Sequence, residues 1–506
     1  MGLYDFSFYD LINRNAVAFG SRICWHEIDD GRELTFADYK KQVDLLAMGL
    51  AQVGIQKGDR IGVVGKNSLE FFLVYGAAAV LGAIVLPVNW RLSADEVCYN
   101  LNDCQPKIVF ADAEFQPMLQ ARRDDLPSVE AYYNLKADSG SALGFTSLLN
   151  VPGQLTPANV ASTDGFVIIH TAAVAGRPRG ALLSHGNMLL ADVLFDYYFG
   201  LTSQDVHLNL LPLFHVGGLF MATSAFHAGA LNLNMSKFDA GTAAKLIQEK
   251  GVSLFFDFPP ILDSILKVAM EEQFNISSLK AVVGLGTPDV IEQYQSVTGG
   301  CYYSMYGQTE TSCLTSMGRY NDRPGSAGKV ILLADVQLVD DHDRPVAPGA
   351  VGEITVKGPM VFKGYWGIPE DNAYTFREGR HHTGDLGRFD ADGFLFYAGR
   401  KAEKELIKPG GENVYPAEVE KIILQHPAVA KTIVIGVPDS KWKEGIKAIC
   451  QLHPGKSLTS KELIRFVGER IASFKKPQYV QFVSELPLKV DGSLDREAVK
   501  SLYKNA

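Results

Sequence analysis

The stretch at residues 58–88 constrains the fold most, because two short β-branched apolar runs flank a longer run with helical spacing. Residues 61–65 and 84–88 have the length and composition of buried strands, and residues 69–83 carry the helical pattern between them. A strand, a crossover helix and a second strand of this kind form a βαβ unit with parallel strands. We therefore expect an α/β protein built on layered sheets.

The same alternation continues along the chain and then changes. Further buried strands are predicted at residues 107–111, 165–169 and 281–286, which favours one large N-terminal body of layered β-sheets and helices at residues 1–399. The charged residues 400–405 have no apolar period and are interpreted as a hinge. Residues 406–506 are predicted to form a small, mobile C-terminal α/β domain, with helices at 416–426 and 458–471 and strands at 432–437 and 448–452.

Charge and cysteine content exclude several classes of protein. The 506 residues carry 48 Lys and Arg against 57 Asp and Glu, a net charge of −9, so the chain lacks the basic footprint of a nucleic-acid binder. The six cysteines have no zinc-site spacing and indicate a reducing compartment.

Small residues and Pro87 make the apolar stretch 71–89 a helix and a strand rather than a membrane span. We expect a cytoplasmic protein; an oligomer is possible, but no heptad repeat indicates one.

Three segments carry residue types that suit a nucleotide. A strand at 166–171 opens into a small-residue loop at 172–180, where backbone N–H groups and two arginines can meet polyphosphate. On this segment alone, a tight turn with solvated arginines is the better interpretation. Residues 306–311 combine an aromatic ring, a glycine, a hydroxyl and a carboxylate, which can cover a base, touch a phosphate and hold Mg²⁺. Asp385 can accept from a vicinal diol, and Arg400 suits ribose or phosphate.

In this order and at these separations, the three segments resemble the adenylate-forming superfamily, which contains acyl-CoA synthetases, peptide-synthetase adenylation domains and firefly luciferase. The resemblance covers nearly the whole chain and is specific because many motifs match together. It also includes residues 34–39, 58–61, 211–215, 349–354 and 410–420. The last of these, with residues 436–439 and 474–477, is most similar to the acyl-CoA synthetase branch, in which the small domain rotates to admit CoA.

This resemblance implies a role for each matching residue. The implied ATP and AMP contacts are Thr171, Gly176, Arg179, Gly284, Gly286, Tyr306, Gly307, Gln308, Thr309, Asp385 and Arg400. The implied catalytic residues are His215, Thr309, Glu310 and Lys489, and Glu310 is the metal ligand for Mg²⁺. The implied CoA-tunnel residues are His215, Lys408, Gly410, Gly411 and Glu412, and the hinge pivot is Glu403 or Glu405. Singly, each residue also has an ordinary structural interpretation, such as Asp385 capping a turn.

Two segments depart from the superfamily pattern. Its phosphate loop is rich in Ser, Thr and Gly, whereas residues 172–175 are Ala, Ala, Val and Ala, and Arg179 replaces a lysine. Each lost charge-assisted bond weakens transition-state binding by about 1.5–3 kcal/mol. Ser493 stands where the superfamily has a lysine that bridges the carboxylate and the α-phosphate, a loss of about 10²- to 10³-fold in rate. Lys489 is the candidate substitute, and adenylation is the half-reaction affected.

The leading hypothesis is an ATP-dependent carboxylate:CoA ligase that forms acyl-CoA through acyl-AMP and releases AMP and pyrophosphate. Its cofactor is Mg²⁺, and ATP and coenzyme A are co-substrates. Two alternatives remain: a catalytically impaired relative that binds acyl-CoA or acyl-AMP, and acyl transfer to a carrier protein. The expected pocket segments at 214–220, 255–259, 283–287 and 303–305 are aromatic and aliphatic, without an obvious Lys or Arg. This predicts a small-molecule monocarboxylic acid as the substrate.

Overall fold

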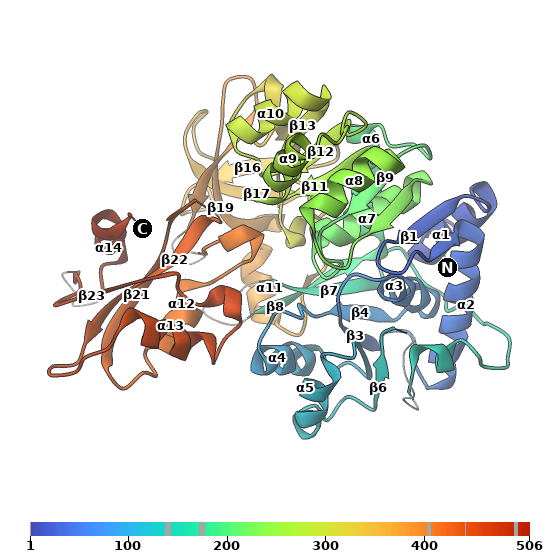
Figure 1. The fold of residues 1–506 in the computed structure, drawn as a ribbon, viewed down its shortest axis with the longest axis horizontal. Coiled ribbons are helices and arrows are strands. Elements are labelled where there is room, and N and C mark those ends of the chain that lie inside the picture. The colour runs from blue at the N-terminus through green and yellow to red at the C-terminus, as the bar shows by residue number, and fades with distance from the viewer. Residues whose placement is uncertain are drawn as a thin grey trace.

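The computed structural model describes residues 2–136, 143–171, 178–401, 406–440, 442–489 and 494–505. Within them, the strands form four sheets. Three sheets lie in the first 400 residues and one lies in the C-terminal part. The last sheet and its helices form a separate group at one side of the molecule (Figure 1). The α/β class and the division into a large body and a smaller C-terminal unit agree with the sequence prediction.

The predicted βαβ unit is confirmed. It consists of β3 (Arg60–Val64), α3 (Leu69–Leu81) and β4 (Ile84–Pro87), and the two strands pair in parallel. Ser68 caps the start of α3 by accepting from the backbone N–H of Phe71. Gly82 ends the helix with φ of 65°, a left-handed conformation that glycine adopts without steric cost.

This unit belongs to a seven-stranded, mostly parallel sheet. Its order is β18 (Gly364–Tyr365), β8 (Arg179–Ser184), β7 (Gly165–Thr171), β4, β3, β5 (Ile108–Ala111) and β6 (Ala131–Asn134). β8 and β18 are antiparallel to their neighbours. The nine-stranded sheet has the order β15 (Lys329–Val330), β14 (Ser316–Arg319), β13 (Cys301–Tyr306), β12 (Ala281–Gly284), β11 (Leu254–Asp257), β9 (Val206–Asn209), β10 (Leu231–Asn234), β1 (Ile23–Glu27) and β2 (Glu33–Thr35).

The remaining sheets are antiparallel or mixed. One has the order β16 (Asp335–Val339), β17 (Gly352–Lys357), β19 (His381–Phe389) and β20 (Leu395–Arg400). The C-terminal sheet has the order β21 (Val429–Asp439), β22 (Lys443–Leu452) and β23 (Tyr479–Val483). The helices of the large body are α1 (Phe8–Ala18), α2 (Phe36–Gln52), α3, α4 (Ala94–Cys104), α5 (Gln116–Ala121), α6 (His185–Phe199), α7 (Val216–Ala228), α8 (Ala240–Lys250), α9 (Ile261–Glu271), α10 (Pro288–Thr298) and α11 (Pro369–Thr375). Those of the small domain are α12 (Pro416–Ile423), α13 (Ser460–Gly468) and α14 (Arg496–Tyr503).

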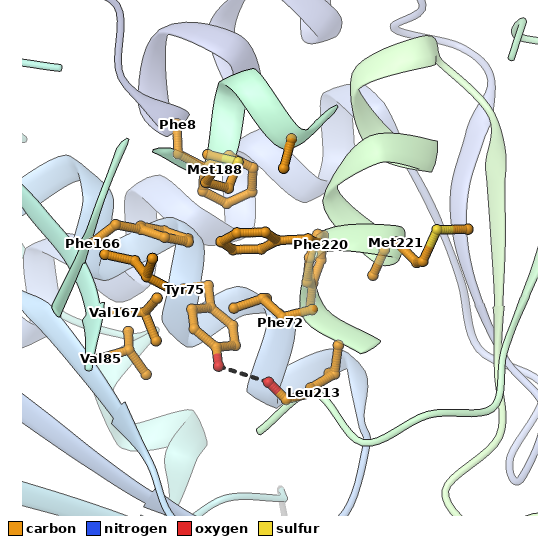
Figure 2. Packing of buried hydrophobic residues seen from close by; sticks show 14 of the residues in the cluster. Phe8, Phe72, Tyr75, Val85, Phe166, Val167, Met188, Leu213, Phe220 and Met221 are labelled. Carbon is orange, nitrogen blue, oxygen red and sulfur yellow. Dashed lines mark hydrogen bonds between the residues drawn. The ribbon is translucent and has the colours of Figure 1, made fainter. Parts of the chain in front are cut away.

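Helix α3 is buried along its whole length, which explains why its sequence is apolar on every face. Figure 2 shows its residues Phe72 and Tyr75 packed with Phe166 of β7 and Phe220 of α7. The hydroxyl of Tyr75 donates to the carbonyl oxygen of Leu213 over 2.9 Å. This bond anchors the segment that leads into His215, so the core positions a predicted site residue.

Several predicted boundaries shift in the structure. β12 ends at Gly284, two residues before the predicted end. At that glycine φ is 150°, and a Cβ would lie 1.9 Å from the carbonyl oxygen of Asp257. α12 ends at Ile423, three residues early, whereas β21 and β22 extend beyond the predicted strands. In the part of the chain that the structure describes, no helix is both long and apolar enough to span a bilayer.

Candidate active site

The site lies beyond the carboxyl ends of parallel strands from two sheets. β7 ends at Thr171, β12 at Gly284 and β13 at Tyr306. Ligands of open α/β sheets bind outside such strand ends. The β19–β20 pair adds Asp385 and Arg400, which face each other as register partners. Three sheets therefore bring their functional side chains to one place.

A first cavity of about 490 Å³ occupies this place. The predicted nucleotide residues that line it are Thr171, Arg179, Gly284, Tyr306, Gly307, Gln308, Thr309, Asp385 and Arg400, together with the predicted metal ligand Glu310. Of the described residues predicted for the nucleotide, Gly286 is outside the lining. Gly176 lies outside the described residues. The small domain contributes Lys408, Asn413 and Tyr415 to the same cavity.

Three donors hold the carboxylate of Asp385, whose residue is 3% exposed. The hydroxyl of Tyr306 and the side-chain amide of Gln308 donate to Oδ2 over 2.8 and 2.5 Å, and Nε of Arg400 donates to Oδ1 over 2.8 Å. Tyr306 also stacks on Tyr397, with ring centroids 6.3 Å apart. The network fixes one oriented carboxylate at the wall of the first cavity.

Glu310 is held in a similar way. The hydroxyls of Thr171 and Tyr365 donate to its Oε1 over 2.9 and 2.8 Å. Among the described residues, no hydrogen bond or ion pair engages Oε2, so this oxygen remains able to bind a cation at the cavity wall.

Arg179 is locked in place by residues that the sequence did not reveal. Its Nη1 donates to Asp371 over 2.7 Å, its Nη2 donates to the Tyr365 hydroxyl over 3.0 Å, and its guanidinium lies 3.8 Å from the Tyr365 ring centroid. Its Nε is buried and has no partner among the described residues. Asp371 follows Arg179 by 192 residues, so no local pattern links them. The arginine therefore keeps a positive charge at the cavity wall.

Glu412 of the small domain contacts three residues of the large body. Its Oε1 lies 2.5 Å from Arg91, and its Oε2 accepts from Asn89 over 3.2 Å and lies 3.7 Å from Nε2 of His215. Burial alone raises the pKa of Glu412, but neighbouring His215 and Arg91 lower it to about 2. The predicted tunnel residues His215 and Glu412 are thus brought together, whereas Arg91 and Asn89 were missed.

Lys408 stands between two cavities. It lines the first cavity and also a second cavity of about 710 Å³. Burial and the charge of Arg400 lower the pKa of Lys408 to about 8. Gly410 lines the second cavity with φ of 58°, and a Cβ there would lie 2.7 Å from the ring of Trp442. Gly411 lies in the same turn, Pro409–Gly411.

The second cavity has an apolar wall and a polar wall. Phe256, Phe258 and Met305 lie on the apolar side, and the two phenylalanine rings stack with centroids 5.3 Å apart. The segments predicted to form the wall contribute no Lys or Arg to the lining, but other segments add Lys66, Arg91, Lys237 and Lys408. Lys66 pairs with Glu114, and Arg91 pairs with Glu412.

Of the predicted residues in the small domain and hinge, the structure describes Lys489 but not Glu403 or Glu405. Lys489 is exposed and lines neither of these two cavities in the present domain orientation. Glu403 and Glu405 lie outside the described residues, as does Ser493. The face of the small domain that meets the large body is therefore the one with Lys408 to Tyr415.

A buried ion cluster holds this face in place. Nζ of Lys475 lies 2.6 Å from Glu96 of α4 and 2.8 Å from Glu418 of α12, and Lys475 is 5% exposed. Glu96 also accepts from the backbone N–H of Ala472 over 3.1 Å. Burial opposes the charge on Lys475, yet the two carboxylates raise its pKa. The cluster joins the two domains in a single orientation.

Glu96→Gln is expected to loosen that orientation. A buried ammonium then keeps one carboxylate instead of two, which weakens domain docking by about 1–3 kcal/mol. Single-turnover kinetics should show slower thioester formation from acyl-AMP and CoA, with unchanged exchange of pyrophosphate into ATP. The matched control is Asp95→Asn, because Asp95 is on the same helix but is exposed and pairs with Arg122. Equal effects of the two variants on thioester formation would contradict a role of Glu96 in domain docking.

Comparison with known sequences gives two family matches, one in each part of the chain. The family described as "AMP-binding enzyme" matches residues 12–366, and "AMP-binding enzyme C-terminal domain" matches residues 418–492. The chain is 32% identical to an indoleacetate–CoA ligase of Aromatoleum aromaticum over 93% of each chain. It is also 32% identical to a feruloyl-CoA synthase of an Amycolatopsis species over 94% of each chain.

Two solved structures of one relative differ in their similarity to this chain. A double mutant of o-succinylbenzoate CoA synthetase from Bacillus subtilis, bound with its product analogue, has a TM-score of 0.85 at 27% identity, over 97% of each chain. The same enzyme in complex with AMP has a TM-score of 0.70 at 27% identity, over 98% of this chain and 99% of that chain. The chain as a whole therefore superposes better on the product-analogue complex than on the AMP complex. The chain belongs to the AMP-binding enzyme family, in the acyl-CoA synthetase branch of the adenylate-forming superfamily.

Proposed function

We propose that the protein is an ATP-dependent ligase that joins CoA to a monocarboxylic acid with an aromatic or other bulky apolar body. The observation that carries this proposal is the junction of the two cavities, where Gly307, Gln308 and Thr309 line both. A nucleotide in the first cavity and an acid in the second then meet at this junction. Holding two reactants in contact and in the right orientation supplies much of the rate enhancement of a reaction.

In the first half-reaction, a carboxylate oxygen of the acid attacks the α-phosphorus of ATP, and pyrophosphate leaves. The residues proposed to meet the phosphates are Thr171, Arg179 and Thr309, and Asp385 accepts from the ribose hydroxyls. The open Oε2 of Glu310 fits a hard cation, so Glu310 is the proposed ligand for Mg²⁺, which would neutralise phosphate charge. Activation as acyl-AMP is needed because a free carboxylate has no good leaving group.

In the second half-reaction, the sulfur of CoA attacks the acyl carbon and AMP leaves. Gly410 and Glu412 on the small domain and His215 on the large body line the polar wall of the second cavity. This wall is the proposed path of the pantetheine arm, whereas the body of the acid is proposed to lie against the apolar wall. Lys408 lines both cavities, and its proposed role is to stabilise the charge on the departing AMP. The present domain orientation suits this step, because these groups already face one another.

The shape of the second cavity supports the proposed class of acid. The stacked rings of Phe256 and Phe258 and the side chain of Met305 offer an apolar slot to a flat or bulky body. Indoleacetate and ferulate, the acids in the names of two relatives, have aromatic bodies. Two of the four basic side chains in the lining, Lys66 and Arg91, are paired with carboxylates, which leaves these two without a free charge for a second carboxylate on the substrate.

Acid-dependent AMP release tests this proposal. The chain is incubated with Mg·ATP and CoA and a panel of aryl, alicyclic, short and long acids, and the thioesters are identified by mass spectrometry. Aryl or alicyclic acids should give AMP and the matching acyl-CoA in equal amounts. AMP release that does not depend on any acid, or an acyl adenylate that is never converted to thioester by CoA, would contradict the ligase assignment.

A further inference from the structure

A third cavity, of about 80 Å³, lies behind His215 between the large body and the small domain. Asn100 of α4 and His170 of β7 line it from the large body, and Glu412 and Asn413 line it from the small domain. His215 and Glu412 border both this cavity and the second cavity. The third cavity therefore adjoins the place where the thiol is proposed to react, and no step described above uses it.

Three residues that line the third cavity carry buried polar atoms that lack partners. Oδ1 of Asn100, Nδ1 of His170 and Oδ1 of Asn413 make no hydrogen bond within the described residues. Asn100 is 3% exposed, and the His170 side chain is 5% exposed. Buried polar atoms are almost always satisfied by protein or by ordered water. Because one water needs only about 10–15 Å³, this cavity has room for more than one.

His170 links the cavity to the outside of the molecule. Its Nε2 lies 2.9 Å from Oδ2 of Asp103, whose side chain is 20% exposed. A neutral imidazole that donates from Nε2 to a carboxylate carries its lone pair on Nδ1, so the unpartnered nitrogen is an acceptor. The ring can take a proton on Nδ1 and release one from Nε2 toward Asp103 and bulk water.

We propose that the third cavity holds ordered water and is the exit path for the thiol proton during thioester formation, ending at the His170–Asp103 pair. This inference rests on the proposed function. As the C–S bond forms, the C–O bond to AMP breaks, and AMP leaves with the electron pair. The S–H proton passes to one nitrogen of His215, and the other nitrogen releases a proton to cavity water. That water protonates His170, and Asp103 delivers a proton to solvent.

Two variants interrupt this path at different points. Asn100→Leu removes a polar anchor of the water without touching the phosphate-loop strand, and His170→Phe removes the acceptor ring. Single-turnover thioester formation from synthetic acyl-AMP and CoA should slow by about 10- to 100-fold in each, within the range for lost acid–base catalysis. The solvent isotope effect in heavy water should grow, because proton release becomes limiting. Exchange of pyrophosphate into ATP should stay unchanged.

Asn102→Leu is the matched control, because Asn102 lies on the same helix but is exposed and donates to the backbone of Asp125. Thioester rates and isotope effects that match wild type in Asn100→Leu and His170→Phe would overturn the proposal. A parallel loss of pyrophosphate exchange in both variants would also overturn it, because it would show a displaced phosphate loop. If the wild-type chain forms thioester from neither acid nor acyl-AMP, the proposed function fails, and the proton path fails with it.

Discussion

Asp385→Asn should abolish most adenylation. The substitution keeps the size of the side chain but removes the charge that faces Arg400 and replaces one acceptor oxygen with a donor. Breaking a buried ion pair on one side costs about 3–5 kcal/mol, and the same change removes the proposed acceptor for the ribose hydroxyls. We expect a loss of about 10²- to 10³-fold in kcat/KM for ATP, measured by pyrophosphate exchange.

Asp335→Asn is the matched control for this prediction. Asp335, in β16 of the same four-stranded sheet, also pairs with an arginine, Arg380, which directly precedes β19, but the Asp335 side chain is 66% exposed and lines neither of the first two cavities. The control should retain wild-type exchange and thermal stability. A small effect of Asp385→Asn, or an equal loss in Asp335→Asn, would remove Asp385 from the nucleotide site.

Glu310→Gln should slow adenylation strongly and thioester formation only slightly. The amide oxygen can still accept from Thr171 and Tyr365, so the local fold is kept, but the charge that faces the proposed Mg²⁺ is lost. Losing an aimed electrostatic group costs about 10²- to 10³-fold in rate. Pyrophosphate exchange should fall by this amount, whereas thioester formation from synthetic acyl-AMP should change far less, because pyrophosphate has no part in that step.

Tyr365→Phe provides a graded comparison for Glu310. It deletes one donor to Oε1 and the acceptor for Nη2 of Arg179 but leaves the Glu310 carboxylate in place, so exchange should fall by about 10- to 100-fold, as for two lost hydrogen bonds. Raising the Mg²⁺ concentration should rescue part of the activity in Tyr365→Phe and little in Glu310→Gln. Equal losses in both half-reactions of Glu310→Gln would show that the residue supports the fold rather than the metal.

Much of the fold was predictable because its strands and helices are coded locally. The βαβ unit at β3, α3 and β4 has apolar runs of the right period, and Ser68 and Gly82 mark the ends of its helix. The strand β23 was not predicted, because all its residues are only partly buried and the run lacks a strong apolar period. β12 ends early for a tertiary reason, since only glycine fits beside Asp257 at position 284.

The candidate site was predictable where its residues lie in compact motifs, and less so where partners come from far along the chain. Asp385 and Arg400 belong to matched motifs, and the structure joins them directly. Tyr365 and Asp371 hold Arg179, yet nothing in the spacing of these residues along the chain indicates that they are in contact. The Glu96–Lys475 pair depends on the orientation of two domains, which a linear pattern does not contain.

Isotope transfer from the acid to AMP tests the central claim most directly. An aryl acid labelled with ¹⁸O in both carboxylate oxygens is converted with unlabelled ATP and CoA, and AMP and acyl-CoA are analysed by mass spectrometry. Attack of the carboxylate on the α-phosphate, followed by thiolysis, should leave one ¹⁸O in AMP and one in the thioester. Unlabelled AMP beside labelled acyl-CoA would contradict the acyl-AMP pathway and, with it, the proposed assignment of the two cavities.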